Sequence, residues 1–513
     1  MNSDDKSKKE MPQYPNPYWR NSVSLPSFPK LNENIRVDIA IVGGGITGIT
    51  TAYLLAKEGM KVAVIEAGSI LNGTTGHTTA KITAQHDLIY DELISHLGKE
   101  KAKLYYEASN EALHFIKNKV SEYSIDCDFS HEDAYLYATS PKYRMKIEKE
   151  YEAYQTLGID GGLLDSIPFE IPIEAALVMK GQAQFHPLKY LASLVGQITQ
   201  SDGSIYENTT AIDIDEGSEP TVITRDGHRI SCNFVISCSH FPFDDGKGFY
   251  FARMYAERSY VLGVKTEKEY PGGMYLSVDN PVRSLRYTTL NGEKLVLIGG
   301  ESHKTGQGMD TMKHYEALES FGNEVLGIKE YMYRWSAQDL ITLDKVPYIG
   351  TISSGHSNIL VATGYRKWGM TNSTAASLLL RDIILKQDNP YKDLFTPSRF
   401  QADPDVKHFI TQNADVAKHL IEGKLDSPMK NPENLTNDEG AVVTVNGKRA
   451  GAYKDENGEL HIVDTTCTHM GCELNWNHGD RTWDCPCHGS RFSFDGNIVE
   501  GPANKPLKKV EEA

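Results

Sequence analysis

The stretch from residue 37 to Glu66 constrains the fold more than any other part of the sequence. An apolar strand pattern runs into a G-x-G-x-x-G turn formed by Gly43, Gly45 and Gly48, and a helical pattern and a second apolar strand follow. The three glycines permit a tight turn, close approach of the backbone to a diphosphate, and close packing of helix on strand. The helix N-terminus favours the diphosphate, and the terminal acid accepts hydrogen bonds from a ribose. We therefore predict a dinucleotide-binding βαβ unit.

Two loops near the end of the chain carry cysteine and histidine residues. Cys467 and His469 lie in C-T-H-M-G-C, and Cys485 and His488 lie in C-P-C-H-G-S. Two thiolates and two imidazoles are the ligands of a Rieske-type [2Fe–2S] cluster. The same four residue types also suit a tetrahedral structural zinc site. The ligand types alone leave both metal centres open.

The residues that flank these ligands resemble the Rieske proteins of quinol-oxidising cytochrome complexes. The resemblance covers residues 434–513 and implies a small all-β domain with a disulfide between Cys472 and Cys487. Ser490 matches a hydroxyl that donates to a bridging sulfide in that family. Phe492 stands where high-potential members have tyrosine, and fewer hydrogen bonds to the cluster imply a lower potential. The ligands implied by this resemblance are Cys467, His469, Cys485 and His488.

The sequence offers only one dinucleotide-binding unit, which bears on the choice between FAD and NAD. A pyridine-nucleotide reductase normally needs a second unit, and Gly246-Lys247-Gly248 lacks the necessary strand and helix context. A flavin transfers electrons singly or in pairs, so it suits a chain that also carries a one-electron centre. These points favour FAD.

Three further segments resemble the D-amino-acid-oxidase superfamily, which includes glycine, sarcosine and amine oxidases. They are a Gly/Thr-rich loop at 73–80, period-2 strand patterns within 251–301, and a P-x-I-G segment at 347–350 followed by a strand and the Gly-rich turn 364–372. The resemblance implies an α/β FAD-binding Rossmann-like domain interleaved with an antiparallel-sheet substrate domain. The positions expected to bind FAD are Gly43, Gly45, Ile46, Thr47, Gly48, Glu66, Ala67, Thr74, Thr75, Thr79, Gly364, Gly369, Met370 and Thr371.

No residue stands out as the catalytic group. His86 follows the flavin loop, and Arg258 and Arg286 lie in the predicted substrate-domain strands, where an arginine can clamp a carboxylate. A buried structural histidine and ion-paired arginines are the commoner roles for such residues. We name all three as candidates and leave the catalytic residue unknown.

These assignments divide the chain into an N-terminal arm (1–36), an FAD-dependent oxidoreductase domain (37–395), a helical linker (396–433) and a Rieske domain (434–513). The formal net charge of −16 argues against nucleic acid as a partner. No apolar run is long enough to span a membrane, and no signal peptide is evident, so we expect a cytoplasmic protein. A disulfide there is unusual.

The sequence thus predicts an oxidoreductase that uses FAD and a [2Fe–2S] cluster. By resemblance, the substrate is a small amine or amino acid, and single electrons pass to the cluster and then to an unknown acceptor or donor. Two alternatives stay open at this point. One is a cluster-fed flavin reductase or monooxygenase, and the other is a non-catalytic redox carrier or sensor.

Overall fold

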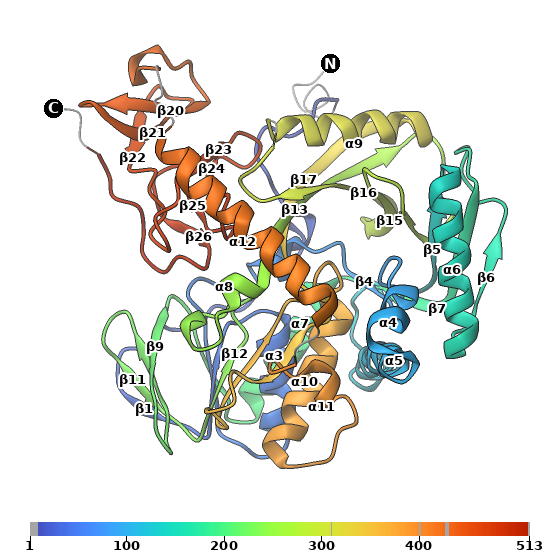
Figure 1. The fold of residues 1–513 in the computed structure, drawn as a ribbon, viewed down its shortest axis with the longest axis horizontal. Helices are drawn as coiled ribbons and strands as arrows, with labels where there is room; N and C mark the ends of the chain where they lie inside the picture. Colours follow the sequence, from blue (N-terminus) through green and yellow to red (C-terminus); the bar gives the residue numbers. More distant parts are fainter. Residues whose placement is uncertain (1–8, 309, 400–401, 426–429, 511–513) are drawn as a thin grey trace.

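The computed structural model describes residues 9–308, 310–399, 402–425 and 430–510. It shows two large sheets that share the oxidoreductase part of the chain and a small β domain at the C-terminal end (Figure 1). Residues outside the described ranges are 1–8 of the predicted arm, 309 of the predicted oxidoreductase domain, 400–401 and 426–429 of the predicted linker, and 511–513 of the predicted Rieske domain. Within the described residues, no helix is long and apolar enough to cross a membrane.

A six-stranded sheet forms the centre of the dinucleotide-binding part. Its strands in spatial order are β18 (Tyr348–Thr351), β19 (Ile359–Thr363), β12 (Phe234–Ser237), β2 (Ile39–Val42), β3 (Val62–Ile65) and β8 (Ser204–Tyr206). All neighbours are parallel except β18 and β19. Strands β2 and β3 are buried throughout, as expected for a parallel sheet covered on both faces.

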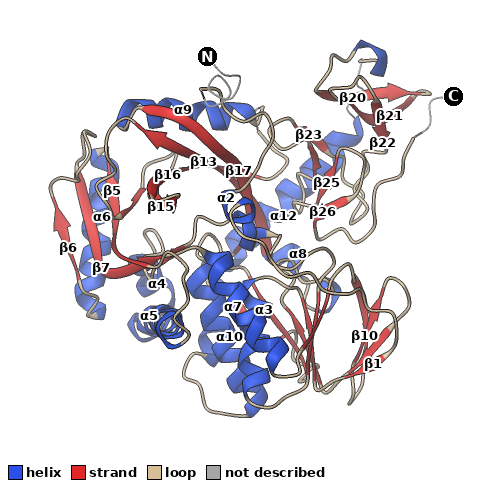
Figure 2. Cartoon of the chain, turned by 180° about the vertical axis from the view of Figure 1, so that it is seen from behind, coloured by secondary structure: helices blue, strands red, loops and turns tan. Residues whose placement is uncertain are grey.

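Helices cover one face of this sheet and a small second sheet covers the other (Figure 2). The helices are α3 (Ile46–Lys57), α7 (Pro187–Gln200) and α10 (Gly369–Leu385). The small sheet contains β1 (Ile35–Arg36), β11 (Arg229–Ser231), β10 (Thr221–Thr224) and β9 (Ala211–Asp215). Helix α3 is buried on nearly every side, and its three threonines are buried along with its apolar residues.

The second large sheet is mostly antiparallel and forms the substrate part. Its strands in order are β17 (Ile328–Thr342), β13 (Met254–Thr266), β16 (Glu293–Lys304), β15 (Arg283–Leu290), β14 (Met274–Ser277), β5 (Ser130–Ala138), β7 (Ala175–Gln184) and β4 (Lys81–Ile82), with β6 (Gly161–Leu164) also on β7. Its helices are α4 (Tyr90–Leu97), α5 (Lys99–Glu122), α6 (Pro141–Leu157) and α9 (Met312–Val325). Together the two sheets confirm the predicted interleaved fold class.

The C-terminal domain consists of two small antiparallel sheets. One contains β20 (Glu439–Val445), β21 (Lys448–Lys454) and β22 (Leu460–Val463). The other contains β23 (Asn475–Asn477), β24 (Thr482–Asp484), β25 (Arg491–Ser493) and β26 (Ile498–Glu500). The preceding elements are α11 (Lys392–Phe395), the long helix α12 (Ala402–Leu425) and the short turn η3 (Pro432–Asn434).

The N-terminal arm joins all three parts. Its short helix α2 (Tyr18–Asn21) buries Trp19, whose Nε1 donates to the carbonyl of Thr78 at 2.6 Å. The fully buried Arg334 on β17 donates to the carbonyl of Pro12 and, at 2.8 Å, to the carbonyl of Gly479 in the C-terminal domain. One guanidinium therefore holds the arm, the substrate sheet and the C-terminal domain together.

Candidate flavin and cluster sites

The glycine turn between β2 and α3 has the geometry that a diphosphate needs. Gly43 has a φ of 108°, and a Cβ there would lie 2.5 Å from the carbonyl oxygen of Cys238. A Cβ on Gly48 would lie 1.9 Å from the carbonyl oxygen of Gly43, so helix and turn approach as closely as glycine allows. Glu66 accepts hydrogen bonds from the backbone N–H groups of Gly44 at 2.8 Å and Gly68 at 2.9 Å. These contacts hold the turn in one backbone conformation that only glycine can adopt at Gly43 and Gly48.

The Thr-rich loop folds back over this turn. It contains the short helix η1 (Thr74–His77), and the Thr75 hydroxyl accepts from the N–H of Ile46 at the start of α3, at 3.0 Å. The Thr74 hydroxyl donates to the carbonyl of Gln338 on β17 at 3.3 Å. The loop therefore lies between the first helix of the dinucleotide unit and the substrate sheet, as expected for a segment that follows a flavin.

A cleft of about 1680 Å³ joins most of the predicted FAD residues. This exceeds the ~300–1,000 Å³ of ordinary small-molecule pockets and suits a dinucleotide. The predicted residues that line it are Gly43, Gly45, Ile46, Thr47, Glu66, Ala67, Thr74, Thr75, Thr79, Gly364, Gly369 and Met370. Gly48 and Thr371 do not line it. Gly48 serves helix packing, and the Thr371 hydroxyl donates to the carbonyl of Thr83 at 3.0 Å.

His86 is fully buried and hydrogen-bonded within the protein. Its Nδ1 lies 2.7 Å from the Tyr105 hydroxyl, and its Nε2 lies 2.8 Å from the carbonyl of Thr83 and 2.9 Å from the Thr371 hydroxyl. Its ring stacks on Trp368 at 5.0 Å, and burial lowers its pKa to about 3. The residue does not line the cleft. Its contacts describe a neutral histidine that braces α10 against the loop before α4.

Neither candidate arginine lines the cleft. Arg286 is buried, donates to the carbonyls of Thr79 and Tyr287, and lies over the ring of Trp19. Arg258 is buried at the boundary with the C-terminal domain and pairs with residues there. Both positively charged groups are engaged by the protein itself.

Two carboxylates that the sequence reasoning missed do line the cleft. Glu257 on β13 and Asp339 on β17 are directly paired across the two strands. Burial raises the pKa of Asp339 to about 6. The Lys367 ammonium lies 3.4 Å from Glu257 and 3.9 Å from Asp339. Lys81 also lines the cleft, and burial lowers its pKa to about 7. The sequence does not reveal this pair, because the two carboxylates come together only through the register of two strands that are distant in the chain.

The two Cys/His loops come together as predicted. The thiols of Cys467 and Cys485 are hydrogen-bond partners, and this bond lowers the pKa of Cys467 to about 6 while the pKa of Cys485 rises. Such a pair titrates as a unit. The Nδ1 atoms of His469 and His488 are buried and have no hydrogen-bond partner within the described residues. Unpaired buried nitrogens and adjacent thiols fit a metal centre that takes both residue types.

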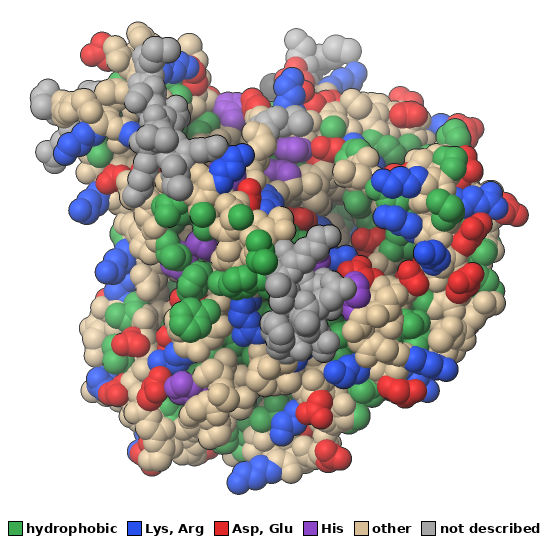
Figure 3. Space-filling model, in the orientation of Figure 1, with side chains coloured by type: hydrophobic (Ala, Val, Ile, Leu, Met, Phe, Trp, Pro, Cys, Tyr) green, Lys and Arg blue, Asp and Glu red, His purple; other side chains and the backbone are tan. Residues whose placement is uncertain are grey.

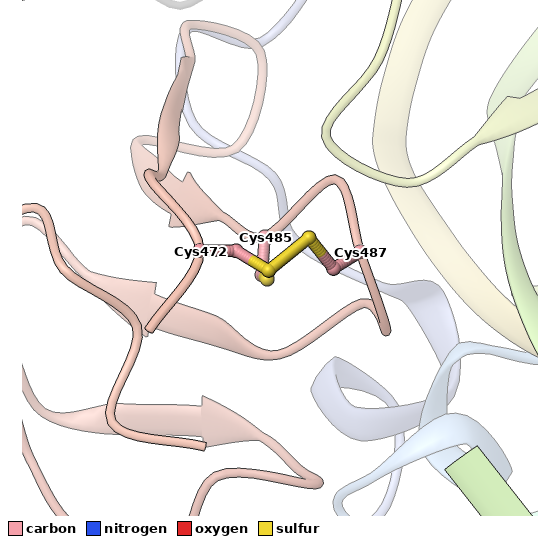
Figure 4. A group of neighbouring side chains, drawn as sticks. All are labelled: Cys472, Cys485 and Cys487. Atoms are coloured by element: carbon pink, nitrogen blue, oxygen red, sulfur yellow. A yellow bond between two sulfur atoms is a disulfide. The ribbon is translucent and has the colours of Figure 1, made fainter. Parts of the chain in front are cut away.

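A disulfide links Cys472 and Cys487, with an S–S distance of 2.11 Å (Figure 4). The Cys485 sulfur lies within 4.8 Å of the two disulfide sulfurs. The Ser490 hydroxyl accepts from the N–H of Ala503 at 3.0 Å, and Phe492 is fully buried. The disulfide joins the two ligand loops, as the resemblance implied.

The oxidoreductase part covers the histidine side of this centre. The Nε2 of His469 lies 3.3 Å from a carboxylate oxygen of Asp245 in η2 (Asp245–Lys247). The Phe251 ring lies 6.2 Å from His469 and 5.7 Å from His488, centroid to centroid. Phe251 belongs to the short helix α8 (Tyr250–Arg253). The surroundings of the cluster ligands are therefore built by two domains.

A buried group of charges, the interface charge network, joins the domains beside this centre. It consists of Arg258, Asp480, Arg491 and Glu500. Arg258 lies 2.6 Å from Glu500 and 3.4 Å from Asp480, and Arg491 lies 3.1 Å and 2.7 Å from the same two carboxylates. Burial alone would raise the pKa of Glu500, but the two guanidinium groups hold it at about 2. All four groups are therefore charged and paired.

Because side chains alternate along a strand, β13 and β17 serve two sites at once. Glu257 and Asp339 line the cleft. Their neighbours Arg258 and Gln338 contact the C-terminal domain, and the Gln338 amide donates to the carbonyl of Gly489 in a cluster loop at 3.0 Å. A Cβ on Gly489 would lie 2.4 Å from the Cβ of Ala256. The same two strands therefore position groups of the cleft wall and of the contact with the C-terminal domain.

Comparisons with known proteins identify the family of each part of the chain. The family model DAO, FAD dependent oxidoreductase, matches residues 38–383, and the Rieske [2Fe-2S] domain model matches residues 427–511. The Rieske 2Fe-2S iron-sulfur protein YhfW of Bacillus subtilis (strain 168) is 55% identical over 497 residues, 97% of this chain and 98% of that protein.

More distant relatives share the oxidoreductase part. The gamma-glutamylputrescine oxidoreductase of Escherichia coli (strain K12) is 24% identical over 375 residues, 70% of this chain and 85% of that protein. The crystal structure of glycine oxidase from Geobacillus kaustophilus is 18% identical with a TM-score of 0.62, covering 72% of this chain and all of that one. The predicted cofactors, FAD and a [2Fe–2S] cluster, are confirmed by the family matches, which favour the cluster over zinc.

Proposed function

Because the chain belongs to the DAO family of FAD-dependent oxidoreductases and carries a Rieske [2Fe–2S] domain, we propose that it is a dehydrogenase that oxidises a small amine or amino acid and passes the electrons singly to its cluster. The enzyme class and both cofactors follow from the family. The substrate class and the direction of electron flow are the proposal.

One observation carries the proposal, which is that the flavin-binding segments and the cluster domain line a single cleft. Gly45 of the glycine turn and Thr75 of the Thr-rich loop line it, and so do Arg491, Glu500 and Gly501 of the cluster domain. The interface charge network seals the domains together beside it. Electrons taken from a substrate at the flavin thus have a cluster domain already docked against the same cavity, which supports transfer within one chain.

The chemistry of the cleft supports a cationic amine as the substrate. Like charges directly opposite each other on neighbouring strands are destabilising, and Glu257 and Asp339 are such a pair. The Lys367 ammonium offsets part of the repulsion. A substrate ammonium group would offset the rest. Gamma-glutamylputrescine oxidoreductase and glycine oxidase, both named for amine-bearing substrates, are among the relatives.

In this proposal the residues of the chain bind and orient, and the cofactors react. When bound, FAD supplies a two-electron acceptor, and the [2Fe–2S] cluster supplies a one-electron carrier. The N-terminus of α3 would hold the diphosphate, with Gly43 and Gly45 leaving room for the backbone to approach it. Glu66 holds the turn in shape through its two backbone hydrogen bonds. Glu257 and Asp339 hold the substrate ammonium group at the cleft wall.

Anaerobic mixing of the holoenzyme with a panel of amines and amino acids tests the proposal. We expect a cationic amine to bleach the flavin absorbance first and to produce the EPR signal of the reduced cluster afterwards. A Cys485→Ser variant, which lacks a cluster ligand, should bleach but give no cluster signal. If no compound bleaches the flavin while a reduced carrier protein does, the direction of electron flow is the reverse of the one proposed.

A further inference from the structure

Two large apolar side chains are exposed beside the cluster histidines. Phe249, which precedes α8, is 62% exposed, and Met470, which follows His469, is 50% exposed. Figure 3 shows hydrophobic side chains gathered over α8 and the neighbouring part of the C-terminal domain. Isolated exposed apolar residues are ordinary on protein surfaces. Here two of them flank the ligands of a redox centre.

These exposed side chains lie close to the cluster ligands. The Phe249 and Phe251 rings lie 6.1 Å apart, and Phe251 lies against both ligand imidazoles. The His469 side chain is itself 13% exposed. Electron transfer slows steeply with distance, so a partner must dock where a redox centre comes nearest the surface. Among the described residues, the Phe249–Met470 edge satisfies that condition.

Positive charge borders the same edge. Three lysines occupy the segment that runs beside the first cluster loop, where the Thr468 hydroxyl donates to the carbonyl of Lys505 at 2.6 Å and Lys509 forms a β-bridge with Val463. All three are exposed, and none makes an ion pair within the ranges that the structure describes. They are Lys505, Lys508 and Lys509. The chain as a whole carries −16, Asp245 lies against His469 at this edge, and Glu511 and Glu512 follow the lysines in the sequence, outside the described residues.

We propose that Phe249, Met470 and these three lysines, together the exit surface, form the docking site of a small acidic one-electron carrier protein. An apolar centre with a charged rim is the usual anatomy of a transient protein interface. The lysines steer an acidic partner toward the apolar centre and repel basic ones. Each encounter moves one electron from the reduced protein to the oxidised carrier, and no bond or proton is exchanged.

The inference rests on the proposed function only in requiring that electrons leave through the cluster. In the test the holoenzyme is therefore reduced with dithionite, and the excess dithionite is removed. The result does not depend on the identity of the amine. The probe is an acidic plastocyanin, a blue-copper carrier whose potential lies above the Rieske range, so it accepts an electron from the reduced cluster. Isothermal titration calorimetry with the oxidised holoenzyme measures binding, and stopped-flow absorbance measures electron transfer from the reduced one.

Charge reversal tests the lysine rim. We expect binding and rate to fall as salt rises, and the rate constant at low salt to fall about tenfold or more in the triple variant K505E/K508E/K509E. The matched control K142E/K146E/K149E places the same three charge reversals on exposed positions of α6, far from the cluster loops. An equal loss in both variants would mean that only total charge matters, and it would overturn the proposal.

Truncation of the apolar centre gives a second, independent measurement. F249A and M470A should each weaken plastocyanin binding severalfold, while M145A, which truncates a 60%-exposed methionine on α6, should leave it unchanged. The cluster EPR spectrum should be the same in every variant, which shows that the centre is intact. Binding that is independent of salt, or tighter binding of a basic c-type cytochrome at the exit surface, would refute an acidic partner.

Discussion

Replacement of Arg258 by methionine should loosen the C-terminal domain from the oxidoreductase part. Arg258 is 1% exposed, and its removal leaves Glu500 and Asp480 buried with Arg491 as their shared partner. Loss of one member of a buried ion pair typically costs ~3–5 kcal/mol. The pKa of Glu500 points the same way, since its displacement from 4.5 to about 2 is a net stabilisation of the charged form of about 3 kcal/mol, after the opposing effect of burial and with Arg258, Arg491, His240 and His77 all contributing. We therefore expect R258M to lose about 2–3 kcal/mol.

Urea unfolding followed by two probes measures this loss. Visible circular dichroism of the cluster reports the C-terminal domain, and flavin fluorescence reports the rest. The two transitions should coincide in the native chain, whereas in R258M the cluster signal should disappear at lower urea. Arg144→Met, which breaks an exposed ion pair with Glu148 on α6, is the control and should change nothing measurable.

The reasoning would be refuted by an R258M chain that unfolds at the same urea concentration as the native chain, with both probes still coincident. A double-mutant cycle with Glu500→Gln sharpens the result. If the pair interacts as the structure shows, the double variant loses less stability than the sum of the two single variants. Additive losses would mean that the two side chains do not act on each other.

Three further predictions concern the same two sites. Because the pKa of Glu500 is lowered to about 2, its contribution to stability is present above about pH 4.5 and is lost as pH falls toward 2. The E500Q variant should therefore lose less stability than the native chain over this pH range. An acid-unfolding transition that is the same in both proteins would contradict this prediction. Asp245→Asn should raise the midpoint potential of the cluster in an EPR redox titration at fixed pH, because a carboxylate that accepts from a ligand imidazole favours the oxidised centre; the neighbouring Asp244→Asn, whose carboxylate pairs with Lys247, should not. Asp339→Asn should raise the KM for a cationic amine about tenfold and leave the flavin spectrum unchanged, and equal kinetics in both enzymes would exclude Asp339 from substrate binding.

Local spacing explains why the cofactor sites were predictable from the sequence. The turn with Gly43 and the loops with Cys467 and Cys485 each place their chemistry within a few residues, so the motif and the site nearly coincide. Arg258 shows the limit of this approach. Strand alternation predicts that it faces one side of a sheet, but its partners Asp480 and Glu500 are 222 and 242 residues away. The local sequence does not indicate which face of the sheet borders the cleft and which face contacts the C-terminal domain.

The pair Glu257 and Asp339 was missed for the same reason. Neither residue sits in a recognisable motif, and each alone resembles an ordinary acid in a strand. The two carboxylates lie next to each other because of the register between β13 and β17, which depends on bulges and on pairing across distant segments. The sequence makes His86 a catalytic candidate because it follows the flavin loop. Its hydrogen bonds with Tyr105 and Thr371 involve helices whose packing the sequence does not reveal.

The clasp at Arg334 has a consequence for biosynthesis. Chains emerge N-terminus first, and domains generally fold as they appear. The arm carbonyl of Pro12 is made long before the carbonyl of Gly479, yet one guanidinium binds both. The arm therefore reaches its final contacts only after the C-terminal domain has been made. Until then the cleft also lacks part of its wall, because Arg491 and Glu500 of that domain line it.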